Sequence, residues 1–290
     1  MAIPDEHVVQ RAIIAQAEHG EYSCATMNAD YATGSELRQA ARSGEFSGHT
    51  SGEAPGSVQA NLVILTRDWA YDFLVFAQRN PKPCPLLEVG EIGDPRTRFL
   101  ADNADIRSDL PRYRVYIDGE LAEEPLEITS RWQDDFVFFL LGCSFTFERA
   151  LSEAGVPLRH IQEGVNVPMY RTTRECTGAG RFTCSPMVVS MRPLTPADAI
   201  RAVEITREYP RVHGSPIHIG DPAALGIADI DRPEWGDPVT IRAGEVPVFW
   251  ACGITPQLAA LVSRPPIMIT HAPGHMFVGD KADYEFRLSG

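Results

Sequence analysis

The sequence lacks the basic surface and the long apolar runs that would direct it to nucleic acid or into a membrane. Acidic side chains outnumber basic ones, and the formal net charge is −13 with an isoelectric point of about 5.1. Nucleic acids and anionic membranes attract basic surfaces, so neither is expected as a partner. No apolar run approaches the roughly 20 residues that a membrane-spanning helix needs. With 44% hydrophobic and 22% charged residues, the composition is typical of a globular protein.

No Cys-x-x-Cys motif occurs among the 6 cysteines, which are scattered along 290 residues. In a chain of this length, such scatter is typical of free thiols in a reducing compartment. The first 20 residues lack the basic start and apolar middle of a signal peptide, and a helix is expected over residues 5–18. We therefore expect a cytoplasmic protein.

The usual phosphate-binding and hydrolase signatures are also absent. The chain has no Walker phosphate loop, no Gly-x-Gly-x-x-Gly, no Gly-x-Ser-x-Gly and no His-Glu-x-x-His. Chemistry driven by nucleotides, flavin-dependent chemistry and zinc-protease chemistry therefore have no support in the sequence.

What the sequence does contain is a strand–turn–helix pattern over residues 244–257. An apolar run of strand length ends at Cys252 and Gly253, and a helical pattern follows, with Thr255 and Pro256 suited to its start. Turns of this kind bring the free N–H groups of a helix to the end of a strand. The next stretch, residues 266–275, is expected to be a strand that carries His271 into a loop.

A second stretch, residues 142–148, has a similar pattern. In both stretches an apolar run is followed by cysteine, by threonine three positions later, and then by Glu148 in one and Gln257 in the other. The match covers only seven residues, so we interpret it as coincidence rather than as a repeat. We nevertheless expect the turns at Cys143 and Cys252 to face one cleft. A helix N-terminus would lower the pKa of either thiol, although buried cysteines are commonly only packing residues.

The order of the elements predicts a mixed α/β fold. Residues 58–89 and 246–271 each resemble a β-α-β unit, whereas the chain between them changes pattern and includes an apolar run, 134–141, that is expected to be a buried helix. We therefore expect a larger three-layer α/β lobe and a smaller two-layer α+β lobe, with the active-site cleft between them. The larger lobe would comprise residues 1–111 and 213–290, and the smaller lobe residues 112–212.

The densest polar cluster lies in residues 212–222. His213, His218 and Asp221 are candidate acid–base groups or metal ligands; alternatively, the histidines bind backbone carbonyls in a turn shaped by glycine and proline. Glu148 at a helix start is either a base or a partner of the helix dipole. Arg171 is one of four arginines next to prolines or turns, and arginine binds carboxylates with two hydrogen bonds.

Six segments taken together resemble a known family: residues 79–89, 142–148, 167–172, 188–193, 213–222 and 247–257. They are similar to a hydro-lyase family whose animal mitochondrial members are D-glutamate cyclases. The resemblance runs from about residue 36 to 280 and implies a two-lobed mixed α/β fold and a carbon–oxygen lyase that removes water. The chain differs from the family pattern at Ala77 and Thr173. It is similar to the bacterial single-module form, which leaves D-glutamate itself open as the substrate.

Cyclisation of D-glutamate to 5-oxo-D-proline would require the enzyme to perform four tasks. We assign residues to these tasks from the chemistry of their side chains alone. Arg171 would bind the α-carboxylate, and Glu148 or His218 would deprotonate the ammonium group. Backbone N–H groups at Cys143–Ser144 or at Gly253–Thr255 would stabilise the oxyanion.

His213 or His271 would protonate the departing hydroxide. ATP is not needed in principle, because closure of a five-membered ring is intramolecular and gains from proximity.

Two other functions remain open at this point. One is a metal-dependent hydratase that uses His213, His218 and Asp221 as ligands. The other is a non-catalytic module that binds small carboxylates. We expect a small carboxylate substrate and no cofactor, while a divalent metal and assembly into a homo-oligomer stay open.

Overall fold

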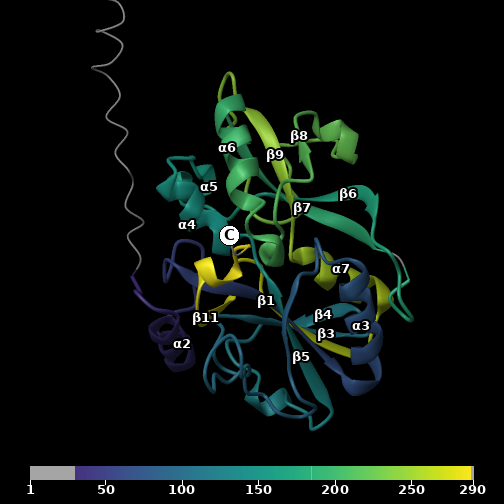
Figure 1. Ribbon diagram of the computed structural model, residues 1–290. Coiled ribbons are helices and arrows are strands. Elements are labelled where there is room, and N and C mark those ends of the chain that lie inside the picture. The colour runs from purple at the N-terminus through teal and green to yellow at the C-terminus, as the bar shows by residue number, and fades with distance from the viewer. Residues whose placement is uncertain (1–29, 184, 289–290) are drawn as a thin grey trace, which may run out of the picture.

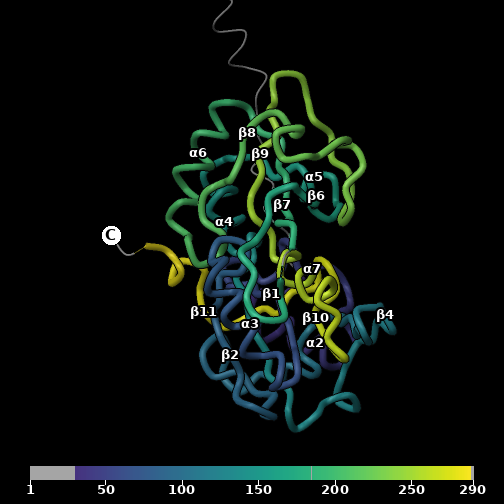
Figure 2. The backbone as a smooth tube through the Cα atoms, turned by 90° about the vertical axis from the view of Figure 1, so that its right-hand side faces the viewer, coloured from purple at the N-terminus to yellow at the C-terminus, as the bar shows by residue number. Residues whose placement is uncertain are grey.

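The computed structural model describes residues 30–183 and 185–288, and it is built on two antiparallel sheets (Figure 1). In Figure 1 the smaller sheet lies in the upper part of the molecule and the larger sheet in the lower part. Figure 2, turned by 90°, shows helices α4 and α7 at the level where the two parts meet. The expected mixed α/β class is confirmed.

The larger sheet has seven strands in the order β2-β5-β1-β10-β3-β4, with β11 also paired to β1. Its strands are β1 (Ser57–Thr66), β2 (Leu86–Val89), β3 (Tyr113–Ile117), β4 (Glu120–Glu123), β5 (Phe136–Gly142), β10 (Ile267–His271) and β11 (Phe277–Ala282). Both faces of β1 are covered: Leu62 and Ile64 pack on one apolar cluster, Val63 and Leu65 on another. A strand buried on both faces reads as a continuous apolar run.

The smaller sheet has four strands in the order β6-β7-β9-β8. They are β6 (Met169–Glu175), β7 (Pro186–Leu194), β8 (His218–Ile219) and β9 (Val246–Ala251). Trp250 on one face of β9 joins the apolar cluster of α4 and α6, whereas Phe249 on the other face packs under the loops that follow β8.

Six α-helices are described: α2 (Gly34–Ser43), α3 (Arg67–Arg79), α4 (Phe145–Glu153), α5 (Arg159–Glu163), α6 (Pro196–Thr206) and α7 (Ile254–Ser263). Apolar spacing and capping residues in the sequence predict helices near residues 35–44, 68–78 and 195–209, and these correspond to α2, α3 and α6. Thr33 and Thr195 cap α2 and α6 by accepting backbone N–H groups, as threonine commonly does. The helix expected over residues 5–18 lies outside the described residues.

Two expectations about the elements are wrong. The apolar run 134–141 forms strand β5 rather than a buried helix, because full burial on both faces removes the periodicity that separates the two. The expected unit at 246–271 does not share one sheet, since β9 lies in the smaller sheet and β10 in the larger one. Neighbouring strands within both sheets pair antiparallel.

Sheet membership also differs from the division expected from the sequence. Strands β3, β4 and β5, which fall within 112–212, belong to the larger sheet. Strands β8 and β9, which fall within 213–290, belong to the smaller sheet. The chain crosses between the sheets twice, through α4 and through α7, and no change of composition marks those crossings.

The two sheets repeat one plan. In each, a long strand leads directly into a helix and an outer strand, and a later middle strand leads into a second helix. This gives β1-α3-β2-β5-α4, with β3 and β4 inserted between β2 and β5, and β7-α6-β8-β9-α7. The strand orders β2-β5-β1-β10 and β8-β9-β7-β6 match position by position. In each case the strand that follows the second helix joins the other sheet, so that β6 lies beside β7 and β10 beside β1.

The repeat extends to individual hydrogen bonds. The Thr146 hydroxyl accepts the Gln59 N–H (3.0 Å) and donates to the Gln59 carbonyl (3.2 Å). The Thr255 hydroxyl accepts the Val188 N–H (3.0 Å) and donates to the Val188 carbonyl (3.3 Å). The two seven-residue stretches therefore have equivalent positions in two related halves, and their interpretation as coincidence is wrong.

Candidate active site

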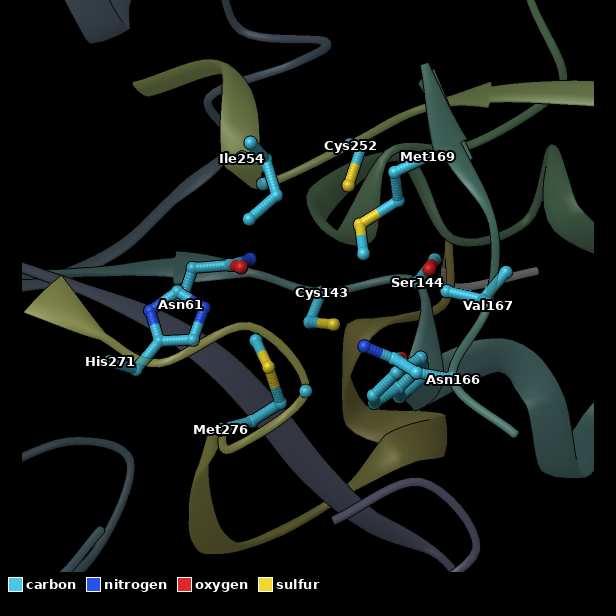
Figure 3. Close-up of a pocket in the computed structure, with 13 residues that line it drawn as sticks. Asn61, Cys143, Ser144, Asn166, Val167, Met169, Cys252, Ile254, His271 and Met276 are labelled. Carbon is cyan, nitrogen blue, oxygen red and sulfur yellow. The ribbon is translucent and has the colours of Figure 1, made fainter. Parts of the chain in front are cut away.

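The turns at Cys143 and Cys252 line one pocket, as expected (Figure 3). Each turn joins the middle strand of one sheet to a helix, β5 to α4 and β9 to α7. The cavity between them is small, with a volume of about 20 Å3. The pocket is lined by Asn61, Cys143, Ser144, Phe145, Asn166, Val167, Met169, Cys252, Gly253, Ile254, His271, Gly274 and Met276.

Both thiols are held at the start of a helix and point toward the same space in Figure 3. They are 7% and 9% exposed. Burial raises the pKa of Cys252 to about 11 and that of Cys143 well above its ordinary range, although backbone N–H groups, including those of Phe145 and Ile254, partly oppose it. Burial therefore outweighs the helix N-terminus, which was expected to lower these pKa values. Both thiols are protonated near neutral pH.

His271 contributes a neutral imidazole to the pocket wall. Its Nδ1 lies 3.0 Å from the backbone nitrogen of Leu62 and 3.3 Å from the carbonyl oxygen of Leu62, so either neutral tautomer finds a partner there. The amide nitrogen of Gln257 lies 3.0 Å from the same Nδ1. Burial lowers the pKa of His271 to about 3, so the ring is uncharged near neutral pH. A neutral imidazole can donate a hydrogen bond from one ring nitrogen, but it does not supply a readily released proton.

Glu148 lies behind the pocket wall in a buried charged cluster. Its Oε1 is 2.6 Å from a terminal nitrogen of Arg192, and Nε2 of His160 lies 3.1 Å from the same oxygen. All three side chains are at most 1% exposed. Burial alone would raise the pKa of Glu148, but the charges of His160 and Arg192 lower it to about 2. A carboxylate held in this way is a poor base for an ammonium group, and Glu148 does not line the pocket.

Two other candidates, Arg171 and His218, lie away from the pocket lining. Arg171 on β6 is exposed, and its backbone N–H donates to Glu234. His218 on β8 places Nε2 2.8 Å from the carbonyl oxygen of Asp221. The structure therefore does not bring Arg171 or His218 to the place where a ligand of this pocket would react.

His213 is buried beside Gly142, and its Nδ1 lies 2.9 Å from the carbonyl oxygen of Lys82. Burial lowers its pKa to about 4. Within residues 30–183 and 185–288, no group of three His, Cys, Asp or Glu side chains is placed to hold a metal ion. The set of His213, His218 and Asp221 is thus not assembled as a metal site. Thr255 lies behind the pocket wall, bonded to Val188.

Two asparagines that the sequence analysis did not single out line the pocket. Asn61 on β1 donates to the carbonyl oxygen of Gly142 at 2.9 Å. It also explains Gly253, because a Cβ there would lie 2.0 Å from the Asn61 amide nitrogen. Asn166 is 5% exposed, and its Oδ1 has no hydrogen-bond partner among the described residues. A polar residue inside the apolar run 58–65 was the only available signal for Asn61.

Comparison with known proteins agrees with this arrangement. A family model described as D-glutamate cyclase matches residues 137–280, which include both turns. A Bacillus licheniformis protein named "Putative hydro-lyase" is 57% identical over 251 residues, covering 87% of this chain and 95% of its own length. The chain belongs to the D-glutamate cyclase family of hydro-lyases. The family and the names of its members support a hydro-lyase-like function for the chain.

Other members of this family are equally similar. The Bordetella petrii hydro-lyase is 59% identical over 243 residues, covering 84% of this chain and 92% of its own length. The Saccharopolyspora erythraea hydro-lyase is 61% identical over 237 residues, with coverages of 82% and 92%. Among solved structures, a nitrogen repressor-like protein from Methanococcus jannaschii matches with a TM-score of 0.35 and 12% identity over 87% of this chain and 98% of its own, a similarity too low to carry an argument.

A search for helices able to cross a bilayer found none within the described residues, because none is both long and apolar enough.

Proposed function

We propose that the protein removes water from a small amino- or hydroxy-carboxylate, with conversion of D-glutamate to 5-oxo-D-proline and water as the leading reaction. The observation that carries the proposal is the shared pocket of the Cys143 and Cys252 turns. Each turn begins a helix, and the N-terminal peptide groups of a helix favour negative charge through the helix dipole. Such groups suit a carboxylate and the oxyanion that forms when an amine attacks it.

The neutral character of the pocket fits this reaction. When an ammonium group and a carboxylate condense to a lactam, the nitrogen gives up two protons, and both leave with one carboxylate oxygen as water. No net proton passes to the protein, so neutral groups that relay protons are sufficient. The protonated thiols and the neutral His271 meet that requirement.

The roles that we propose for the site residues therefore differ from those assigned from the sequence. Ser144 and the N–H groups of the two turns would bind the carboxylate and the oxyanion, in place of Arg171. Asn166 Oδ1 would accept a hydrogen bond from the substrate amine or hydroxyl group. His271 Nε2 would donate to the departing oxygen.

The test is incubation of purified protein with D-glutamate, L-glutamate and related hydroxy acids, followed by mass spectrometry for loss of water. We expect loss of water from D-glutamate without ATP. Turnover that is abolished by a chelator and restored by a divalent cation would favour the metal-dependent hydratase. Tight binding of these acids without turnover would favour the binding module. Either of these two results would reject the proposal.

A further inference from the structure

The residue behind the pocket wall that contacts Ser144 is a buried arginine. Arg192 lies on β7, is 0% exposed, and has its guanidinium between the rings of Phe147 and Trp250, at 5.6 and 5.3 Å from the ring centroids. Glu148 holds one terminal nitrogen at 2.6 Å. A side chain packed and paired in this way cannot swing away without exposing a charge to an apolar interior.

The same terminal nitrogen lies 3.1 Å from Ser144 Oγ. A guanidinium has only donors, so the Ser144 oxygen must be the acceptor of this hydrogen bond. The Ser144 proton is therefore directed elsewhere. It finds no acceptor among the residues that the structure describes, although Ser144 is only 4% exposed. The remaining direction for this side chain is the pocket that it lines.

A hydroxyl that accepts a hydrogen bond from a cation is polarised and becomes a better donor. Ser144 is also the residue at the start of α4, where its side chain makes no capping hydrogen bond. In the same pocket, Asn166 Oδ1 is buried and unpartnered, which indicates that a ligand completes the hydrogen bonding of this site.

The equivalent turn at Cys252 has no serine that accepts a hydrogen bond from a buried arginine. Gly253 stands where Ser144 stands, and Gln257 where Glu148 stands. By the same correspondence, Val63 on β1 is the counterpart of Arg192 on β7. The polarised donor is present on one side of the pocket only, so the two turns, although related, would bind different ends of a ligand.

We propose that Ser144 donates a hydrogen bond to the carboxylate that is attacked and to the oxyanion formed from it, and that Arg192 is the positioning residue that orients this hydroxyl. The inference rests on the proposed function for the identity of the reaction. The hydrogen bond from Ser144 can be tested without that reaction, because any small carboxylate bound in the pocket can reveal it.

The kinetic test compares Ser144→Ala with Ser190→Ala. Ser190 is a matched control, because its hydroxyl lies 3.2 Å from the same guanidinium but is buried outside the pocket lining. With D-glutamate as substrate, we expect Ser144→Ala to lower kcat roughly 100- to 1,000-fold, the usual loss for one oxyanion donor, with a smaller change in KM. Ser190→Ala should stay near wild type. Equal kcat losses in both variants would overturn the proposal.

Arg192→Lys tests the positioning role in a double-mutant cycle. We expect Arg192→Lys to lower kcat in the wild-type background but to cause little further loss in the Ser144→Ala background. A merely structural role would produce the same loss in both backgrounds. Thermal unfolding of each variant establishes that folded protein is compared.

A crystallographic test separates this inference from the proposed function. Crystals soaked with D-glutamate or with 5-oxo-D-proline should show a carboxylate or lactam oxygen within hydrogen-bond distance of Ser144 Oγ. That contact without any loss of water in solution would support the inference and reject the proposed function. A ligand held elsewhere in the pocket, or no bound ligand from either soak, would overturn the inference.

Discussion

The Cys143 turn and the Cys252 turn have the same backbone and the same threonine anchor, yet they differ in charge. Behind the first lies the buried cluster of Glu148 and Arg192, whereas Gln257 and the neutral His271 stand behind the second. The two turns thus share one backbone arrangement, but charged side chains surround the first turn and neutral side chains surround the second. The hydrogen bonds that shape each turn are the same in both halves, whereas the side chains around the two turns differ.

Glu148→Ala and Gln257→Ala should show the largest difference between the halves. Removing Glu148 leaves a buried guanidinium without its carboxylate, which costs about 3–5 kcal/mol of the free energy of unfolding. Removing Gln257 leaves neutral groups without a partner, which costs about 1–3 kcal/mol. Urea denaturation measures both. Equal losses would mean that the cluster at the first turn is not distinguished by its charge.

The pH dependence of stability probes one histidine beside each turn. Burial lowers the pKa of His213 to about 4 and that of His271 to about 3, from 6.5 for both. As the pH falls below 6.5, the unfolded chain binds protons that the folded chain does not. The free energy of unfolding should therefore fall toward pH 4, by up to about 1.4 kcal/mol per pH unit for each histidine. His213→Gln and His271→Gln should each flatten that slope; an unchanged slope would contradict their burial as neutral rings.

Thr146→Val and Thr255→Val test the equivalence of the halves. Each change removes a hydroxyl that pairs with both backbone groups of one strand residue. We expect each to lower the free energy of unfolding by about 1–3 kcal/mol, with similar values at the two sites. A Thr→Ser series at the same positions is the control, because it keeps the hydroxyl. A loss confined to one turn would argue against equivalent roles.

Cys143→Ser and Cys252→Ser should have the smallest effects. The attack of an amine on a carboxylate needs no thioester, and forming a thioester would itself expel water, so the difficult step would only be moved. We expect turnover within roughly tenfold of wild type, which corresponds to about 1.4 kcal/mol of disturbed geometry. Intact-mass spectrometry of enzyme trapped during turnover should show no covalent adduct. An adduct mapped to either thiol would reverse this expectation.

The helices were the part of the fold that could be predicted most directly. In α3, Phe73 and Phe76 recur at helical spacing and are buried, and in α6 the cap at Thr195 and the proline after it mark the start. The continuous apolar run of β5 has no such period, so its assignment to a helix was wrong. The strand register and the crossing of the chain between sheets depend on contacts between distant residues, which no local pattern records.

For the site, the strand–turn–helix pattern predicted both turns and their meeting at one pocket. It did not predict Asn61 and Asn166, which are separated by 105 positions along the chain and acquire their roles only from the neighbours that the fold brings to them. Arg171 and Arg192 could not be distinguished in the sequence. One is exposed on β6, whereas the other is buried behind Ser144.

The sequence by itself determined the residues that must form each turn: a small residue after an apolar strand, a threonine to anchor it, and a helix to follow. These are local requirements of backbone geometry and hydrogen bonding. Only the tertiary structure decided which of the acidic, basic and imidazole groups are charged and where they face. Burial and neighbouring charges set those properties, and they arise when strands far apart in the chain pack into two sheets.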